Sequence, residues 1–196
     1  MTRLEQQLQF IKEIDQLKSI CRRSYLLSQN RKENSAEHSW HVAVMALLLK
    51  DHADCEINVG RVVEMLLIHD IVEIDAGDTF CYDEEGIQSQ HDRERKAAER
   101  IFGLLPDDQG KRLFDLWLEF DAEETDDARF AVAVDRLMPL LHNLGTEGKS
   151  WKENGIVKDQ VLNRNSKIGK SSSRLWEYIE AKIMEAAEKG ILPERV

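Results

Sequence analysis

Residues 66–78, LLIHDIVEIDAGD, place acidic and imidazole side chains inside an apolar run and just after it. These side chains are His69, Asp70, Glu73, Asp75 and Asp78. Burying an ionised carboxylate is costly unless a cation, a metal ion or several hydrogen bonds compensate its charge. A fold that buries this segment must therefore bring a compensating partner to it from elsewhere in the chain.

The composition favours a helical fold. Hydrophobic residues make up 42% of the 196 residues and charged residues 33%, whereas glycine (10) and proline (3) are scarce, which suits a compact helical protein better than a strand-rich one. A chain of this length can bury a substantial core, and a single domain is the simplest expectation. We therefore predict an all-α fold with one domain over residues 1–196.

Apolar residues at helical spacing predict the first helices. One apolar stripe predicts a helix over about 4–21. Asn34 and Glu37 match a capping box ahead of the apolar run at 40–49, which predicts a buried central helix. A third helix is expected over 58–77, with an asparagine in the capping position at its start and a glycine at its end.

The rest of the chain is expected to be mostly helical too. Residues 80–90 are polar and predict a loop. Beyond them the pattern predicts helices over about 92–102, 106–120, 125–144 and 171–190. The segment at 66–78 thus lies near the C-terminal end of the third helix.

The net charge of −10 at pH 7 restricts the partners of the protein. A surface for nucleic acid polymers or anionic membranes needs clustered lysine and arginine, so we expect neither partner, whereas a small phosphorylated ligand is compatible with this charge. The N-terminal segment lacks the apolar core of a signal peptide, and the longest apolar run, 42–49, is too short to span a bilayer. We expect a cytoplasmic protein whose three cysteines, without a CxxC pair, are reduced thiols.

The segment at 66–78 contains half of a metal site. His69 and Glu73 are four residues apart and share a helix face, and Asp70 can converge on the same point. Imidazole and carboxylate ligands suit one divalent ion such as Mn, Co, Fe, Zn or Mg. The missing ligands must come from elsewhere, and the candidates are His38 in AEHSW and Asp135, which is isolated in the apolar run FAVAVDRLMPLL.

The ordered motifs AEHS, HDIVEIDAGD and AVDRL resemble those of the HD-domain metal-dependent phosphohydrolases, specifically the branch that contains the 5'-deoxynucleotidases. The resemblance covers about residues 15–145. It implies an HD-domain helical bundle with this motif core, on which C-terminal helices at 156–190 would pack. It also implies a homodimer, for which two-fold symmetry is the default.

Carried over residue by residue, the resemblance implies that the metal ligands are His38, His69, Asp70 and Asp135. Glu73 and Asp78 occupy catalytic positions, and Arg23 occupies the phosphate-binding position. A bound divalent ion polarises a phosphoryl oxygen and lowers the pKa of bound water. A carboxyl such as Glu73 can orient that water or handle its proton, and an arginine can neutralise the phosphate oxygens through a bidentate contact.

The segment CRRSYLL departs from the family pattern, in which tryptophan commonly follows the arginine. Here Ser24 follows Arg23, and Tyr25 comes next. The neighbouring Arg22 is also a cation, so the assignment of Arg23 depends on an ungapped alignment to His38. We therefore expect a weaker preference for deoxy substrates than the family pattern implies.

We predict a 5'-nucleotidase that releases phosphate from nucleoside or deoxynucleoside 5'-monophosphates. One alternative is an HD phosphohydrolase that acts on nucleoside triphosphates or an alarmone, and another is a metal-containing nucleotide-binding module without turnover. His41 and His142 lie near the motifs, but a role as hydrogen-bonded core residues is favoured over metal ligation. Trp151 is a candidate for lining a nucleobase pocket.

Overall fold

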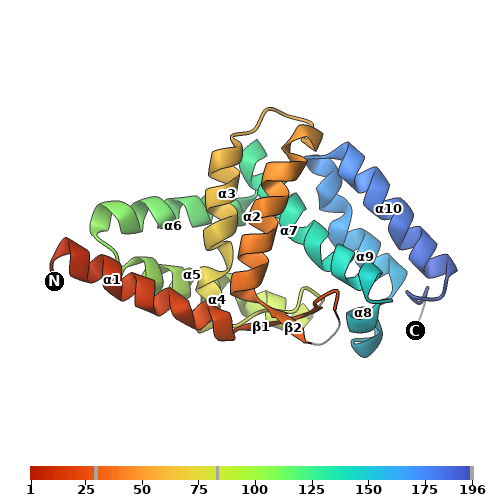
Figure 1. The fold of residues 1–196 in the computed structure, drawn as a ribbon, viewed down its shortest axis with the longest axis horizontal. Helices are drawn as coiled ribbons and strands as arrows, with labels where there is room; N and C mark the ends of the chain where they lie inside the picture. Colours follow the sequence, from red (N-terminus) through yellow and green to blue (C-terminus); the bar gives the residue numbers. More distant parts are fainter. Residues whose placement is uncertain (29–30, 83, 195–196) are drawn as a thin grey trace.

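A computed structural model describes residues 1–28, 31–82 and 84–194. The chain runs through short and long helices with one two-stranded sheet among these residues (Figure 1). In chain order, the elements are α1 (Arg3–Glu13), η1 (Ile14–Ser19), β1 (Cys21–Tyr25), β2 (Lys32–Asn34), α2 (Ser35–Leu49), η2 (Lys50–His52), α3 (Val59–Ile68), η3 (His69–Val72), α4 (Glu73–Ala76), α5 (Glu84–Phe102), α6 (Asp107–Ala122), α7 (Asp126–Gly145), α8 (Lys149–Glu153), α9 (Lys158–Asn165), η4 (Ser166–Lys170) and α10 (Ser173–Glu188), where η denotes a 3-10 segment. The predicted all-α fold class is confirmed, with the small sheet as an addition.

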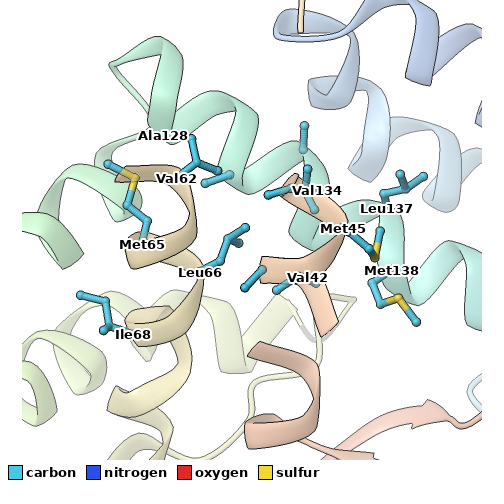
Figure 2. Packing of buried hydrophobic residues seen from close by; sticks show 14 of the residues in the cluster. Val42, Met45, Val62, Met65, Leu66, Ile68, Ala128, Val134, Leu137 and Met138 are labelled. Carbon is cyan, nitrogen blue, oxygen red and sulfur yellow. The ribbon is translucent and has the colours of Figure 1, made fainter. Parts of the chain in front are cut away.

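Helix α7 lies at the centre of the fold and contacts α2, α3, α6, α8 and α10. Figure 2 shows the core between α2, α3 and α7, where Val42, Leu66 and Val134 interdigitate and are fully buried. A helix that is apolar on most faces must be surrounded on most faces. Helix α2 departs from this rule, because it buries one side, which includes Val42 and Ala46, and exposes Trp40 and Leu47 on another. The predicted buried central helix is therefore buried on one side only, and α7 takes the central position.

The helix starts follow the predicted capping residues. Asn34 accepts a hydrogen bond from the backbone N–H of Glu37, and the Glu37 side chain accepts one from the Asn34 N–H in return. Asn58 accepts from the N–H of Arg61 at the start of α3. Such side-chain caps satisfy backbone donors that have no partner inside the helix. These local signals fix where α2 and α3 begin.

Two segments differ from the expectation. The predicted helix over 4–21 ends early, and residues 21–25 form β1, which pairs antiparallel with β2. Pairing with another strand overrides the weak helical preference of this short segment. The predicted loop at 80–90 is shorter than expected, because α5 begins at Glu84; Asp83 lies outside the described residues.

The predicted helix over 58–77 is interrupted where it carries the acidic and imidazole residues. Helix α3 ends at Ile68, the tighter segment η3 follows, and α4 ends at Gly77, whose φ of 75° is readily adopted by glycine. A 3-10 stretch inside a helix is often found at functional positions.

Among the described residues, no helix has the length and apolar character needed to cross a membrane.

Candidate metal centre and catalytic cavity

Three side chains from three elements converge near the middle of the fold. His38 lies in the first turn of α2, His69 begins η3, and Asp135 lies in the middle of α7. One ligand atom from each lies within 4.8 Å of the other two. The Nε2 atom of His38 is 2.8 Å from Oδ1 of Asp135, and Nε2 of His69 is 3.6 Å from the same oxygen. The helix packing thus brings together three of the four predicted ligands in a cluster.

The fourth predicted ligand, Asp70, lies beside this cluster. Its Oδ1 is 3.0 Å from Nε2 of His69, while its Oδ2 accepts a hydrogen bond from Nη1 of Arg22 at 2.6 Å. Asp70 and Asp135 thus each have a carboxylate oxygen near Nε2 of His69, and His38 reaches the same oxygen of Asp135. The structure places the set together, as a single centre requires.

The orientation of His69 suits a metal ligand. Its Nδ1 donates to the carbonyl of Leu66 at 2.9 Å, and its Nε2 is buried and has no hydrogen-bond partner among the described residues. A histidine that donates through one ring nitrogen presents a lone pair at the other nitrogen when the ring is neutral. That lone pair faces the carboxylates of Asp70 and Asp135. All three groups are then acceptors, so they cannot hydrogen-bond to one another but can bind a cation between them.

The carboxylates change the protonation of the histidine. Burial alone would lower the pKa of His69, but the neighbouring Asp70 and Asp135 outweigh it and raise the pKa to about 9. Burial would likewise raise the pKa of Asp135, but the hydrogen bond with His38 and the nearby imidazole of His69 hold it well below its usual range. The carboxylates of the cluster therefore stabilise positive charge at this point, whether it is carried by a proton or by a metal ion.

The pKa values of the two predicted catalytic carboxyls are raised, whereas the pKa of Asp135 is lowered. Burial, with the repulsion of Asp70, raises the pKa of Glu73 well above its ordinary value, and burial also raises the pKa of Asp78. Oε2 of Glu73 accepts a hydrogen bond from Oγ of Ser35 at 2.5 Å. A raised pKa makes a carboxyl better suited to general acid catalysis. Both residues line one cavity with Asp70 and Asp135.

The structure brings Arg22 to this cavity, whereas Arg23, the predicted phosphate-binding residue, points elsewhere. Successive side chains of a strand point to opposite sides. In β1, the side chains of Arg22 and Ser24 are turned inward, and the exposed Arg23 places its guanidinium over the ring of Phe80, 5.6 Å from its centroid. The pairing of β1 with β2 is irregular between Cys21 and Tyr25, and sequence spacing alone does not show which arginine faces inward.

The cavity has a volume of about 230 Å³. The acidic residues and Arg22 line it. The lining also contains polar and aromatic side chains that include Tyr82, Arg136, Asn143, Trp151 and Arg164. Trp151 is buried and lines the cavity, as its candidate role requires, whereas Ser24 is buried outside the cavity lining.

Sequence reasoning missed one buried acid near the centre. Glu33, the residue before the capping Asn34, is only 1% exposed, and its Oε2 lies 3.3 Å from Nδ1 of His38. A carboxylate in this position orients a ligand histidine and fixes which nitrogen faces the metal. An acidic residue just before a helix is common for other reasons, and so the sequence offers no specific signal for this role.

His41 and His142 lie beside Glu33 and outside the cluster of His38, His69 and Asp135. Neither residue lines the cavity. The structure therefore separates these two histidines from the predicted metal centre.

Three comparisons relate the chain to known proteins. The sequence profile of the HD domain family matches residues 14–176. Among curated proteins, the chain is 33% identical over 164 residues to the protein named 5'-deoxynucleotidase HDDC2 from Xenopus laevis, a match that covers 83% of this chain and 78% of that protein. The human protein of the same name is 33% identical over 135 residues, which cover 68% of this chain and 65% of the human protein.

Solved structures also resemble this chain. A crystal structure named as a predicted metal-dependent phosphohydrolase from Magnetospirillum magnetotacticum MS-1 has a TM-score of 0.93 at 53% identity, and the match covers 97% of this chain and 95% of that one. A conserved hypothetical protein from Pyrococcus furiosus shares the fold, with a TM-score of 0.62 at 20% identity over 92% of this chain and 99% of that one. The chain therefore belongs to the HD domain family, as its three ordered motifs predict.

Proposed function

We propose that the protein is a metal-dependent 5'-nucleotidase that releases phosphate from nucleoside or deoxynucleoside 5'-monophosphates. The observation that carries the proposal is the buried Nε2 of His69, which has no hydrogen-bond partner in the described part of the chain and faces the carboxylates of Asp70 and Asp135 in the cavity. The 5'-deoxynucleotidase names of the relatives support the choice of substrate class.

The ligands of one divalent ion in this proposal are His38, His69, Asp70 and Asp135. When bound, such an ion supplies a Lewis acid for a phosphoryl oxygen and a bound water of lowered pKa. Imidazole and carboxylate ligands suit Mn, Co, Fe, Zn or Mg.

The remaining residues bind the phosphate and move protons. Arg22 neutralises phosphate oxygens, for which its planar guanidinium is well suited. Glu73 uses Oε2 to accept the hydrogen bond from Ser35, which leaves Oε1 to hold and transfer a proton. Asp78, with its raised pKa, can protonate the 5'-oxygen that leaves as phosphate is released.

The part of the cavity that Trp151 lines is proposed to hold the nucleoside. Trp151 offers an aromatic surface, and Tyr82 and Asn143 add polar groups to the same lining. Ligand sites typically combine such apolar surfaces with a few polar groups that fix the orientation of the ligand. A cavity of about 230 Å³ suits a small nucleotide and not a nucleic acid polymer.

A second candidate substrate class has its own support. Arg136 and Arg164 also line the cavity, although Arg136 already donates to the carbonyl of Arg164. Two arginines there favour a substrate with further negative charge, such as a nucleoside triphosphate or an alarmone. This alternative keeps the same metal centre and changes the substrate and the product.

We also propose that the protein is a cytoplasmic homodimer. Trp40, Leu47 and Leu48 on α2 and Leu67 on α3 are exposed, and a group of exposed apolar side chains is typical of a contact surface. The three cysteines are free thiols, which suits a reducing compartment.

The test of the function is phosphate release from a panel of mono-, di- and triphosphates, each assayed with the candidate metals. The proposal predicts inorganic phosphate from 5'-monophosphates as the fastest reaction. Release of pyrophosphate or triphosphate from longer substrates at a higher kcat/KM would instead support the second candidate. A metal-loaded protein that releases no phosphate from any nucleotide would support a binding module without turnover.

A further inference from the structure

A second cluster of metal-ligating side chains lies outside the catalytic cavity. It consists of Glu33 from β2, His41 from α2 and His142 from α7, and one ligand atom of each lies within 4.8 Å of the other two. Glu33 and His142 are buried, and His41 is half-buried. None of the three belongs to the first cluster, and none lines the cavity.

The Nδ1 atom of His142 is the observation that points to a ligand. This atom is buried and has no hydrogen-bond partner among the described residues, and the side chain is only 3% exposed. It faces Oε2 of Glu33 across 3.8 Å, which is too long for a hydrogen bond. Buried polar atoms almost always have a hydrogen-bond or metal partner, so a bound species is expected between Glu33 and His142.

The spacing of the pair suits two ligands of one ion. Metal–ligand bonds of about 2.0–2.2 Å place neighbouring ligand atoms roughly 3–3.6 Å apart around a divalent ion. The separation of 3.8 Å between Glu33 and His142 is close to that range and needs only a small adjustment. His41 approaches the same point from α2, where its ring lies 6.4 Å from the ring of His142.

We propose that Glu33, His41 and His142 form a second divalent metal site. Two imidazoles and one carboxylate suit Zn²⁺ or another borderline ion such as Co²⁺, and they leave a coordination position for water. The second site goes beyond the proposed function, because the reaction uses a single ion at the first centre and these residues do not reach the substrate cavity.

Glu33 couples the second site to the first. Its Oε2 lies 3.3 Å from Nδ1 of His38, whose Nε2 lies 2.8 Å from Asp135 in the first centre. An ion on Glu33 withdraws negative charge from the hydrogen bond that orients His38 and makes this imidazole a weaker ligand. Occupancy of the second site is therefore expected to lower the affinity of the first, and the reverse effect must be equal.

The experiment is a count of bound ions. The full chain is stripped with a chelator, dialysed to equilibrium against Zn²⁺, and analysed for metal and protein. The wild type is expected to hold two ions per chain at saturation. The variants His142→Leu and His41→Leu are expected to hold one ion each, and His69→Ala is expected to hold one because it keeps the second site.

The matched control is His91→Leu, which removes an exposed histidine outside both clusters and should leave two ions bound. Circular dichroism checks that each variant folds, and the half-buried His41 provides a variant with little risk to the core. The visible absorption of bound Co²⁺ gives a second readout, and the bands that belong to the second site should vanish in a variant that loses it.

Two results would overturn the proposal. One is a single ion per chain in the folded wild type. The other is two ions retained by both His142→Leu and His41→Leu, which would assign the extra ion to the surface. The count is independent of turnover: two ions with no phosphate release would reject the proposed function and keep this site, whereas phosphate release with one ion would do the opposite.

Discussion

Nη1 of Arg22 lies 2.6 Å from Oδ2 of Asp70, so an arginine from the small sheet neutralises the aspartate that follows His69. An ion at the first centre would take over this neutralisation and free the guanidinium for another anion. The same arginine is then available in the cavity, where a substrate phosphate is expected.

Removal of one proposed ligand should empty the first centre. His69→Ala and Asp70→Ala are each expected to bind one ion fewer per chain than the wild type, because sites with few protein ligands rarely survive the loss of a member. Elemental analysis after dialysis measures this loss. Full metal content in both variants would contradict the assignment of the centre.

The inward arginine should matter more than its neighbour. Arg22→Ala is expected to lower kcat/KM by about a hundredfold, because it removes a charged donor from the transferred group, whereas Arg23→Ala should change it only slightly. Lysine at position 22 should restore little, because it lacks the planar fork of arginine. Steady-state kinetics of the matched pair decide the point, and a larger loss for Arg23→Ala would support the ungapped alignment.

Glu73 should act in the chemical step and not in metal binding. Glu73→Gln keeps the hydrogen bond acceptor for Ser35 but cannot transfer a proton, so kcat is expected to fall by roughly a hundredfold. Metal content should stay at the wild-type level. Unchanged turnover in this variant would show that Glu73 has a structural role.

Without metal, the fold should lose stability as the pH rises from about 6.5 to about 9. The pKa of His69 rises from 6.5 to about 9 in the fold, where Asp70 and Asp135 outweigh the opposing effect of burial. A raised pKa means that the protonated form stabilises the fold; this contribution is complete below pH 6.5 and is lost through pH 9. The Tm of chelator-stripped protein, measured against pH, should therefore fall across this window.

The control for the pH dependence is His69→Gln, which should flatten the fall in Tm over the same window. Saturating metal should also flatten it, because an ion replaces the proton as the source of positive charge. A wild-type Tm that stays constant or rises between these pH values would contradict the prediction.

The exposed apolar side chains of α2 should hold the proposed dimer together. Trp40, which is 63% exposed, lies on the same helix as the exposed Leu47 and Leu48. Trp40→Glu is expected to yield monomers, because it places a charge in a dry contact surface. Light scattering at micromolar concentration measures the change, and Tyr178→Glu on α10 provides a control with similar exposure. A monomeric wild type would refute the dimer.

Much of the fold was predictable because helix signals are local. The capping side chains of Asn34 and Asn58 bond within four residues of themselves, so their spacing in sequence determines the result. The strand β1 was not predictable in this way. Its partner is β2, and CRRSYLL does not alternate in polarity in a manner that reveals a strand.

The same limit applies to the site. His38, His69, Asp70 and Asp135 were identified as a set because their motifs occur in order, and the packing of α2, η3 and α7 brings them together. The choice between the two arginines depended on the direction of a strand side chain. Glu33 was missed because its burial results from the packing of distant elements and leaves no local pattern.

The two histidines of the first centre differ in what orients them. Nδ1 of His69 bonds the main-chain carbonyl of Leu66, whereas Nδ1 of His38 faces the side chain of Glu33. No substitution at position 66 removes a carbonyl, so the geometry of His69 is inherited from the path of the backbone. A single codon change at position 33 would alter the geometry of His38. Evolution can therefore tune the strength of this centre through one ligand while the other stays fixed.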